Sequence, residues 1–311
     1  MKPVSESWLK SSPYDRFSYF IAIKVDRHKT LLQTIEKLGL NFMVLTVAGN
    51  RHFFIFPPGK KLPRPVGSAL PAMGESPYMF VAHYDRVEGS PGANDNGVAV
   101  FHLLRAATLL AQRNFDNWII VFTDKEEITS GESFKMQGSF TLAQKIKTFG
   151  LEKAKIYNFD TCGTGDTFVL SNMADSILEK TDSPGIQKIK TDMQNLRYHA
   201  LKTAHFLNLE KVLLAPIPFC DDMGFLRAGF AAQTITILPS EDASKYEALL
   251  RSRPEFTDLI VSGGIKNSPE KRHLPVTWKN MNTPADTIDR LTPQFFDQAV
   301  NFMVELCNQE L

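Results

Sequence analysis

The sequence has few cysteines, no long apolar run and no excess charge of either sign. Cys162, Cys220 and Cys307 are its only cysteines, and an odd, sparse set is not a disulfide framework. No run of about 18 apolar residues occurs, which argues against a membrane span. The first residues also lack the apolar stretch of a secretory signal. We therefore expect a cytoplasmic protein that does not act at a membrane.

The charge balance points away from nucleic acid. Lys and Arg total 35 against 34 Asp and Glu, a net charge of +1, and no basic stripe interleaved with aromatics is visible. The phosphate-binding pattern Gly-x-x-x-x-Gly-Lys and the Gly-x-Ser-x-Gly elbow are also missing, which disfavours a nucleotide site and a serine hydrolase. With 43% hydrophobic residues, the 311-residue chain is long enough to bury a large core.

Apolar runs and helical patterns alternate along the chain and predict an α/β fold with a mixed, mostly parallel sheet. We expect a hairpin through Gly49-Asn50. We treat the chain as a single domain over 1–311, in which 1–77 form an N-terminal segment with the first strands. The polar, irregular stretch 239–282 is a candidate lid or specificity loop. Continuous apolar runs predict strands at 42–47, 52–56, 78–82, 118–122, 156–159 and 231–238, and 3.6-residue periodicity predicts helices at 30–38, 97–112, 139–149, 187–207 and from Thr292-Pro293 onward.

Acidic residues and one histidine follow the predicted strands. His83-Tyr84-Asp85 comes after the run 78–82, Glu126-Glu127 lies just beyond 118–122, and Asp160 ends 156–159. Asp95 lies at a helix start between the first two. The carboxyl ends of strands collect at one rim of an open α/β sheet. Carboxylates crowded there repel each other unless a cation compensates them, and imidazole with carboxylate suits Zn²⁺. We therefore expect a divalent metal site.

These motifs carry a resemblance to a known family. His83-Tyr84-Asp85, the segment GANDNG (92–97), the Glu pair, Asp160 and TPADTID (283–289) occur in the order typical of the zinc aminopeptidases of metallopeptidase family 28. That family also contains the glutaminyl cyclases. The resemblance runs from about residue 78 to the end, and the first 77 residues carry none of these motifs. It implies a three-layer zinc-exopeptidase fold with helices on both faces of the sheet.

The resemblance also implies roles for individual residues. His83 and Asp160 would bind a first metal, Glu127 a second, and Asp95 would bridge both. Asp85 would hydrogen-bond the other ring nitrogen of His83 and fix its tautomer. Glu126 would be the general base that takes a proton from the attacking water and returns it to the leaving amine.

The sequence departs from the family at two positions. Asn282 stands where the family has its last metal-binding histidine, and an amide oxygen is a weaker ligand for Zn²⁺ than imidazole. Three outcomes stay open: coordination through the amide oxygen, a protein with one tightly bound zinc, or loss of hydrolysis. His273 is a candidate substitute ligand. Asp222 replaces a histidine that lines the cleft, and we expect it to favour binding of a substrate's α-amino group.

The sequence therefore predicts a metal-dependent exopeptidase of the aminopeptidase type. Its substrates would be small peptides, and its cofactor one or two zinc ions, with the second site weak or taking another divalent ion. A glutaminyl cyclase-like acyl transferase and a non-catalytic relative stay as alternatives. The oligomeric state cannot be read from the chain. Among the remaining residues, we expect His102 and Cys162 in the core, and His199 and His205 on a solvated helix face.

Overall fold

The computed structural model describes residues 6–61, 76–127, 134–178, 183–218 and 221–309. Its centre is an eight-stranded sheet in the order β1-β2-β4-β3-β5-β8-β6-β7. The four central strands β4, β3, β5 and β8 run parallel, while β1 and β2 on one side and β6 on the other join antiparallel. The strands are β1 (Asn41–Val47), β2 (Asn50–Phe56), β3 (Tyr78–His83), β4 (Trp118–Thr123), β5 (Lys155–Phe159), β6 (Thr167–Ser171), β7 (Val212–Ala215) and β8 (Ala232–Leu238).

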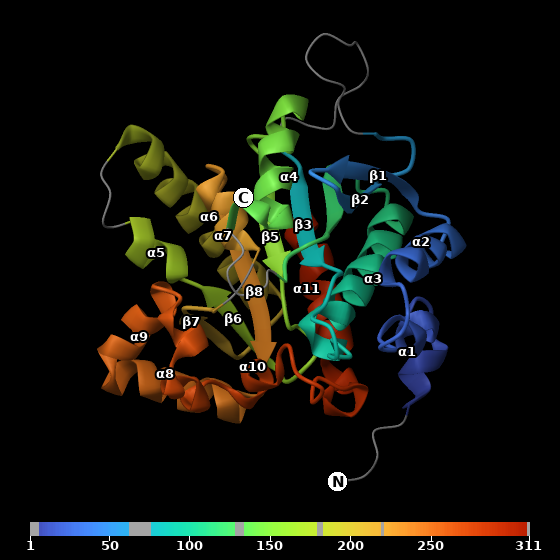
Figure 1. Cartoon of the computed structure of the whole chain (residues 1–311). Coiled ribbons are helices and arrows are strands. Elements are labelled where there is room, and N and C mark those ends of the chain that lie inside the picture. The colour runs from blue at the N-terminus through green and yellow to red at the C-terminus, as the bar shows by residue number, and fades with distance from the viewer. Residues whose placement is uncertain (1–5, 62–75, 128–133, 179–182, 219–220, 310–311) are drawn as a thin grey trace.

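Helices surround this sheet (Figure 1), which confirms the predicted α/β class with a mixed, mostly parallel sheet. Short 3₁₀ segments connect several of them, among them Glu6–Lys10 and Tyr14–Arg16 near the N-terminus. The helices are α1 (Phe17–Phe20), α2 (Arg27–Lys37), α3 (Val98–Gln112), α4 (Gly138–Ile146), α5 (Met173–Leu178), α6 (Pro184–Phe206), α7 (Asp222–Arg227), α8 (Ser240–Ser252), α9 (Pro254–Val261), α10 (Val276–Asn280) and α11 (Phe296–Asn308).

The continuous apolar strands are buried on both faces. In β3, Phe80 packs into a cluster with α3 and α11, whereas its neighbours Met79 and Val81 pack into a second cluster with Leu142 of α4. Alternate side chains of a strand point to opposite faces, so a strand covered on both sides needs an unbroken apolar sequence. The predicted hairpin is also confirmed, because β1 and β2 pair antiparallel with Val47 opposite Asn50. The strands β6 and β7 were not predicted.

Two expectations about single segments are wrong. The stretch 239–282 is largely helical (α8, α9 and α10) rather than irregular, because its apolar residues turn inward to a cluster with Tyr246 and Trp278 and leave the polar ones outside. Its role as a lid or specificity loop stays a prediction. His199 is buried rather than solvated, since one ring nitrogen lies 2.6 Å from the Tyr157 hydroxyl.

The predicted start at Thr292-Pro293 is confirmed, because Thr292 precedes the 3₁₀ turn Pro293–Phe295 that runs into α11; the Thr292 hydroxyl donates to the Gly163 carbonyl and accepts from the amide of Gly165.

Other single-residue expectations are confirmed. His102 is fully buried in α3 with Nδ1 2.7 Å from the Tyr14 hydroxyl, Cys162 is buried, and His205 is exposed. Within the described ranges, no helix is long and apolar enough to cross a membrane.

Candidate metal centre

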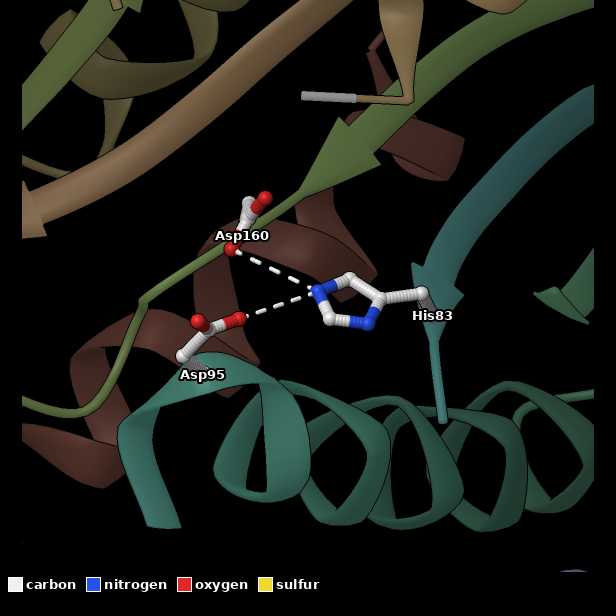
Figure 2. Close-up of side chains that lie close together, drawn as sticks. All are labelled: His83, Asp95 and Asp160. Carbon is white, nitrogen blue, oxygen red and sulfur yellow. Dashed lines mark ion pairs between the residues drawn. The ribbon is translucent and has the colours of Figure 1, made fainter. Parts of the chain in front are cut away.

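Two strand ends and one turn bring three candidate ligands together. His83 is the last residue of β3, Asp160 follows β5 directly, and Asp95 lies in the turn Ala93–Gly97 that leads into α3. The Nε2 atom of His83 is 3.1 Å from Asp95 Oδ1 and 4.0 Å from Asp160 Oδ1. Figure 2 shows both carboxylates converging on that nitrogen. Parallel neighbouring strands place their carboxyl ends at one edge, which is why His83 and Asp160 meet here although they are 77 positions apart in the chain.

These three side chains fit a divalent cation. All are buried, and one potential ligand atom from each lies within 4.8 Å of the others. Among the described residues, none is a hydrogen-bond partner of His83 Nε2, Asp95 Oδ2 or Asp160 Oδ1, although buried polar atoms are normally paired. Donors at the tetrahedral zinc distance of about 2.0–2.1 Å are about 3.3 Å apart, close to the spacing seen. Imidazole with carboxylates is a donor set that zinc accepts.

The turn that carries Asp95 is held by its own asparagines. Asn96 donates to the Phe159 carbonyl at 2.8 Å and accepts from the Thr161 amide, and Asn94 accepts from the Gly163 amide at 2.7 Å. These bonds tie the Asp95 turn to the segment that carries Asp160. Hydrogen bonds between these two asparagine side chains and the backbone thus set the spacing of the candidate ligands Asp95 and Asp160. The sequence did not predict this role for either asparagine.

Asp286 was also missed as a functional residue, although it lies in the motif TPADTID. Its buried carboxylate accepts hydrogen bonds from the amides of Asn94 and Asp95, each at 2.9 Å, and its own carbonyl accepts from Ala93. Charge-assisted bonds of this kind are among the stronger ones in proteins. Asp286 therefore fixes the backbone of the Asp95 turn.

The loop after β4 carries the pair of glutamates. Its backbone is irregular, with Lys125 at φ 62, and the amides of Glu126 and Glu127 donate to the two carboxylate oxygens of Asp85 at 3.1 and 3.0 Å. Asp85 Oδ1 also lies 3.4 Å from His83 Nδ1. Asp85 thus connects the histidine to the glutamate loop. Its predicted effect on the His83 tautomer stays a prediction, as do the individual ligand roles.

The electrostatics show a cluster that needs positive charge. Burial raises the pKa of Asp160 to about 8, and the nearby Asp95 carboxylate adds to this. Burial and Asp95 likewise raise the pKa of Glu127 to about 9, and burial with Glu127 raises the pKa of Glu126 well above its usual value. Burial alone would lower the pKa of His83, but the contacts with Asp85 and Asp95 raise it well above normal. A bound divalent ion would reverse this and keep the carboxylates ionised.

Asn282 lies beside Glu127, as predicted, but does not present its oxygen there. It follows α10 in a left-handed conformation with φ 61, is exposed, and its Nδ2 donates to Glu127 Oε2 at 2.9 Å. In this arrangement the amide of Asn282 is a hydrogen-bond donor to the Glu127 carboxylate, and the predicted ligand role of either residue stays a prediction. His273 is not in the cluster; its Nε2 accepts from Arg272 and lies 3.9 Å from Glu270.

Asp221 and Asp222 lie at the start of α7, close to the cluster. Asp221 is fully buried and accepts from Thr123 at 2.6 Å, so it joins α7 to the end of β4. Burial raises the pKa of Asp222 to about 7, with the hydroxyl of Thr234 opposing. The negative charge of Asp222 acts on Asp160, so the site is acidic on this side. Its predicted role in holding a substrate amine stays a prediction.

The family model for peptidase family M28 matches residues 66–306. This is well over half of the chain, so the protein belongs to peptidase family M28, as the sequence motifs predicted. It is therefore a member of an enzyme family. No curated protein matches the chain significantly. The family match does not include the first 65 residues, although several of them pack close to the site.

Solved structures with the same fold include two kinds of enzyme. A leucine aminopeptidase precursor from Bacteroides thetaiotaomicron has a TM-score of 0.60 at 16% identity, over 96% of this chain and 94% of that one. The glutaminyl cyclase of Porphyromonas gingivalis has a TM-score of 0.60 at 16% identity, over 96% and 95%. The zinc aminopeptidase BSAP from Bacillus subtilis has a TM-score of 0.51 at 17% identity over 82% of this chain. The present chain spans about half of that protein, 48% of its length.

Proposed function

We propose that the protein is a zinc-dependent aminopeptidase that hydrolyses the first peptide bond of small peptides. The observation that carries this is the buried set His83, Asp95 and Asp160, whose potential ligand atoms lie close together and find no hydrogen-bond partner within the part of the chain that the structure describes. Membership of peptidase family M28 supports a hydrolytic reaction. When bound there, the ion would polarise the scissile carbonyl and lower the pKa of the attacking water toward about 7.

Glu126 is the proposed general base. Its carboxylate is buried, and one of its oxygens lies within 4.8 Å of a ring nitrogen of His83. Burial and the neighbouring Glu127 hold its pKa above the usual value, which suits a group that takes and returns a proton near neutral pH. Glu126 accepts the proton from the attacking water and passes it to the leaving amine. The amide of Gln137, 3.5 Å away, and the backbone bond to Asp85 keep this side chain in place.

The second ion site is proposed to be weak. Asp95 and Glu127 alone would supply its protein ligands, because Asn282 directs a donor at Glu127 where a third ligand is needed. A carboxylate that accepts an amide N–H is also partly satisfied without a cation. One tightly held ion per chain follows from this arrangement, and a second ion would bind only at higher concentration.

The reaction is tested with aminoacyl-coumarin substrates on chelated protein and after addition of Zn²⁺, Mn²⁺ or Co²⁺. Hydrolysis should depend on the added ion. Glu126→Gln should reduce turnover by about 10²- to 10⁴-fold with the metal content unchanged, while Glu152→Gln at an exposed position should match the wild type. The proposal fails if no amide is cleaved under any metal condition.

A glutaminyl cyclase activity is the second candidate, because glutaminyl cyclases of known structure share the fold over nearly the whole chain. The same protein samples would be offered a peptide with N-terminal glutamine. Ring closure with release of ammonia, in the absence of coumarin release, would favour the cyclase over the aminopeptidase. We rank it second because Asn282 lies in the part of the site that the resemblance assigns to the cyclase zinc.

A further inference from the structure

A buried arginine from the N-terminal part of the chain lies between the two loops that carry the candidate ligands. Arg27, the first residue of α2, is 5% exposed. Its Nη1 donates to the carbonyls of Tyr84 and Asp85 at 3.2 and 3.0 Å, and its Nη2 donates to those of Pro91 and Gly92 at 2.7 Å each. One guanidinium therefore bridges the segment after His83 and the turn before Asp95.

The surroundings of Arg27 are built for this contact. Gly92 has φ 58, and a Cβ there would lie 2.6 Å from Arg27 Nη2, so only glycine lets the guanidinium approach. The guanidinium also lies over the ring of Phe20, 4.6 Å from its centre. In the described part of the chain, no carboxylate forms an ion pair with Arg27. A planar fork with two nitrogens can satisfy two pairs of carbonyls, which a lysine ammonium cannot.

Arg86 makes the reciprocal connection. It lies three residues after His83, and it donates to the carbonyls of Ile21 and Ala22 at 2.9 Å each. The N-terminal helices and the ligand loops are thus linked in both directions, and in Figure 1 α1 and α2 lie along α3, the helix that follows the Asp95 turn. Arg27 lies outside the family match of 66–306, so the motifs of the family do not account for this linkage.

We infer that Arg27 is a positioning residue of the metal centre: it fixes the distance between the His83 segment and the Asp95 turn, so that the ligand atoms are at binding distance before an ion arrives. The residues before the family match would then complete the site rather than simply precede it. This inference rests on the proposed metal centre, although it does not depend on which reaction that centre performs.

The charge of Arg27 and its hydrogen bonds to the two loops predict opposite effects on metal affinity when Arg27 is replaced, which makes the inference testable. A guanidinium close to the cluster repels a divalent cation, so removing its charge would tighten metal binding if charge dominated. If Arg27 acts by holding the two loops, its removal weakens binding, as loss of groups that orient metal ligands typically costs about 10–100-fold in affinity. The direction of the change therefore separates the two effects.

The test measures the dissociation constant of Zn²⁺ by competition with a chelator on wild type, Arg27→Met, Arg27→Lys and Arg16→Gln. Arg27→Met should bind Zn²⁺ about 10–100-fold more weakly. Arg27→Lys keeps the buried charge but cannot bridge both pairs of carbonyls, so it should fold and bind more weakly than wild type, less severely than Arg27→Met. Arg16, whose Nη2 donates to Gln33 away from the centre, supplies the control and should leave the constant unchanged.

The visible absorption of the Co²⁺-loaded proteins adds a readout of ligand geometry that general destabilisation does not move. We expect an altered spectrum for Arg27→Lys at saturating Co²⁺ and a wild-type spectrum for Arg16→Gln. Wild-type affinity and spectrum in Arg27→Lys, or tighter Zn²⁺ binding in Arg27→Met, would overturn the positioning role while leaving the proposed function intact. A wild-type protein that binds no Zn²⁺ would overturn both.

Discussion

Replacing Asn282 by histidine should create a tight second ion site. In the wild type, Asn282 Nδ2 lies 2.9 Å from Glu127 Oε2, so a ring at this position starts within reach of the same carboxylate. The backbone there has φ 61, a left-handed conformation that histidine adopts more readily than most residues. The position is exposed, so the larger ring meets no packed core. Asn282→His is therefore expected to fold.

The expected gain can be worked out from the ligand count. A structural zinc site with four ligands contributes about 10–16 kcal/mol, which is about 2.5–4 kcal/mol for each ligand. Adding one imidazole should thus tighten the second ion by about 70- to 900-fold. Asn282→Ala removes only the hydrogen bond to Glu127, worth about 0.5–1.5 kcal/mol, and should tighten the second ion by at most about 10-fold.

The assay is a Zn²⁺ titration followed calorimetrically, with elemental analysis of each protein after dialysis. We expect about one retained ion for wild type and Asn282→Ala, and about two for Asn282→His. Two tightly bound ions in the wild type would show that Asn282 does not impair the second site. Equal affinities in the histidine and alanine variants would refute the assignment of position 282 as a missing ligand.

Two further predictions concern Asp222 and His102. Asp222→Ala should raise KM for substrates with a free α-amino group by about 10-fold, the effect of one charge-assisted bond, with little change for analogues that lack the amine; an unchanged KM would show that Asp222 does not hold the amine. Burial lowers the pKa of His102 to about 3, so its contribution to stability is present above pH 6.5 and is lost as the pH falls toward 3. At pH 5 this loss is about 2 kcal/mol. Urea unfolding of chelated wild type and His102→Gln at pH 7.5 and 5 should show a smaller loss in the variant, and equal losses would contradict the assignment.

Parts of the fold with strong local patterns were predictable. β3 and β4 are unbroken apolar runs, and the sheet that covers them on both faces requires that pattern. β6 and β7 were missed because they are short, with five and four residues. Helix α2 was predicted at 30–38, but the short helical segments before it, Tyr14–Arg16 and α1, were missed for a different reason. Their short turns are stabilised by burial of Tyr14 and Phe17 against Phe101 of α3, a contact that local sequence does not reveal.

The candidate site also has residues that the sequence predicted and residues that it did not. The sequence predicted that His83, Asp95 and Asp160 lie close together, because the carboxyl ends of strands meet at one edge of the sheet. Arg27 could not be predicted, because it acts on backbone carbonyls, which leave no side-chain pattern. Asp286 lies in the recognised motif 283–289, but its bonds to the backbone amides of Asn94 and Asp95 could not be foreseen from the sequence. The interpretation of His199 as solvated rested on its basic neighbours, yet Arg197 in the same helix pairs with Asp175 and is itself buried. A charged residue near a histidine in sequence is thus a poor guide to its exposure when an ion pair compensates the charge.

The central claim is that His83, Asp95 and Asp160 hold one divalent ion. The most direct measurement is the metal content of the wild type and of His83→Gln, by elemental analysis after dialysis against metal-free buffer, with thermal unfolding of the chelated proteins to confirm that both fold. We expect about one tightly held ion per wild-type chain and close to none in the variant. An ion content that is the same in both proteins would contradict the assignment, as would a wild-type protein that retains no ion and takes up none when Zn²⁺ is supplied.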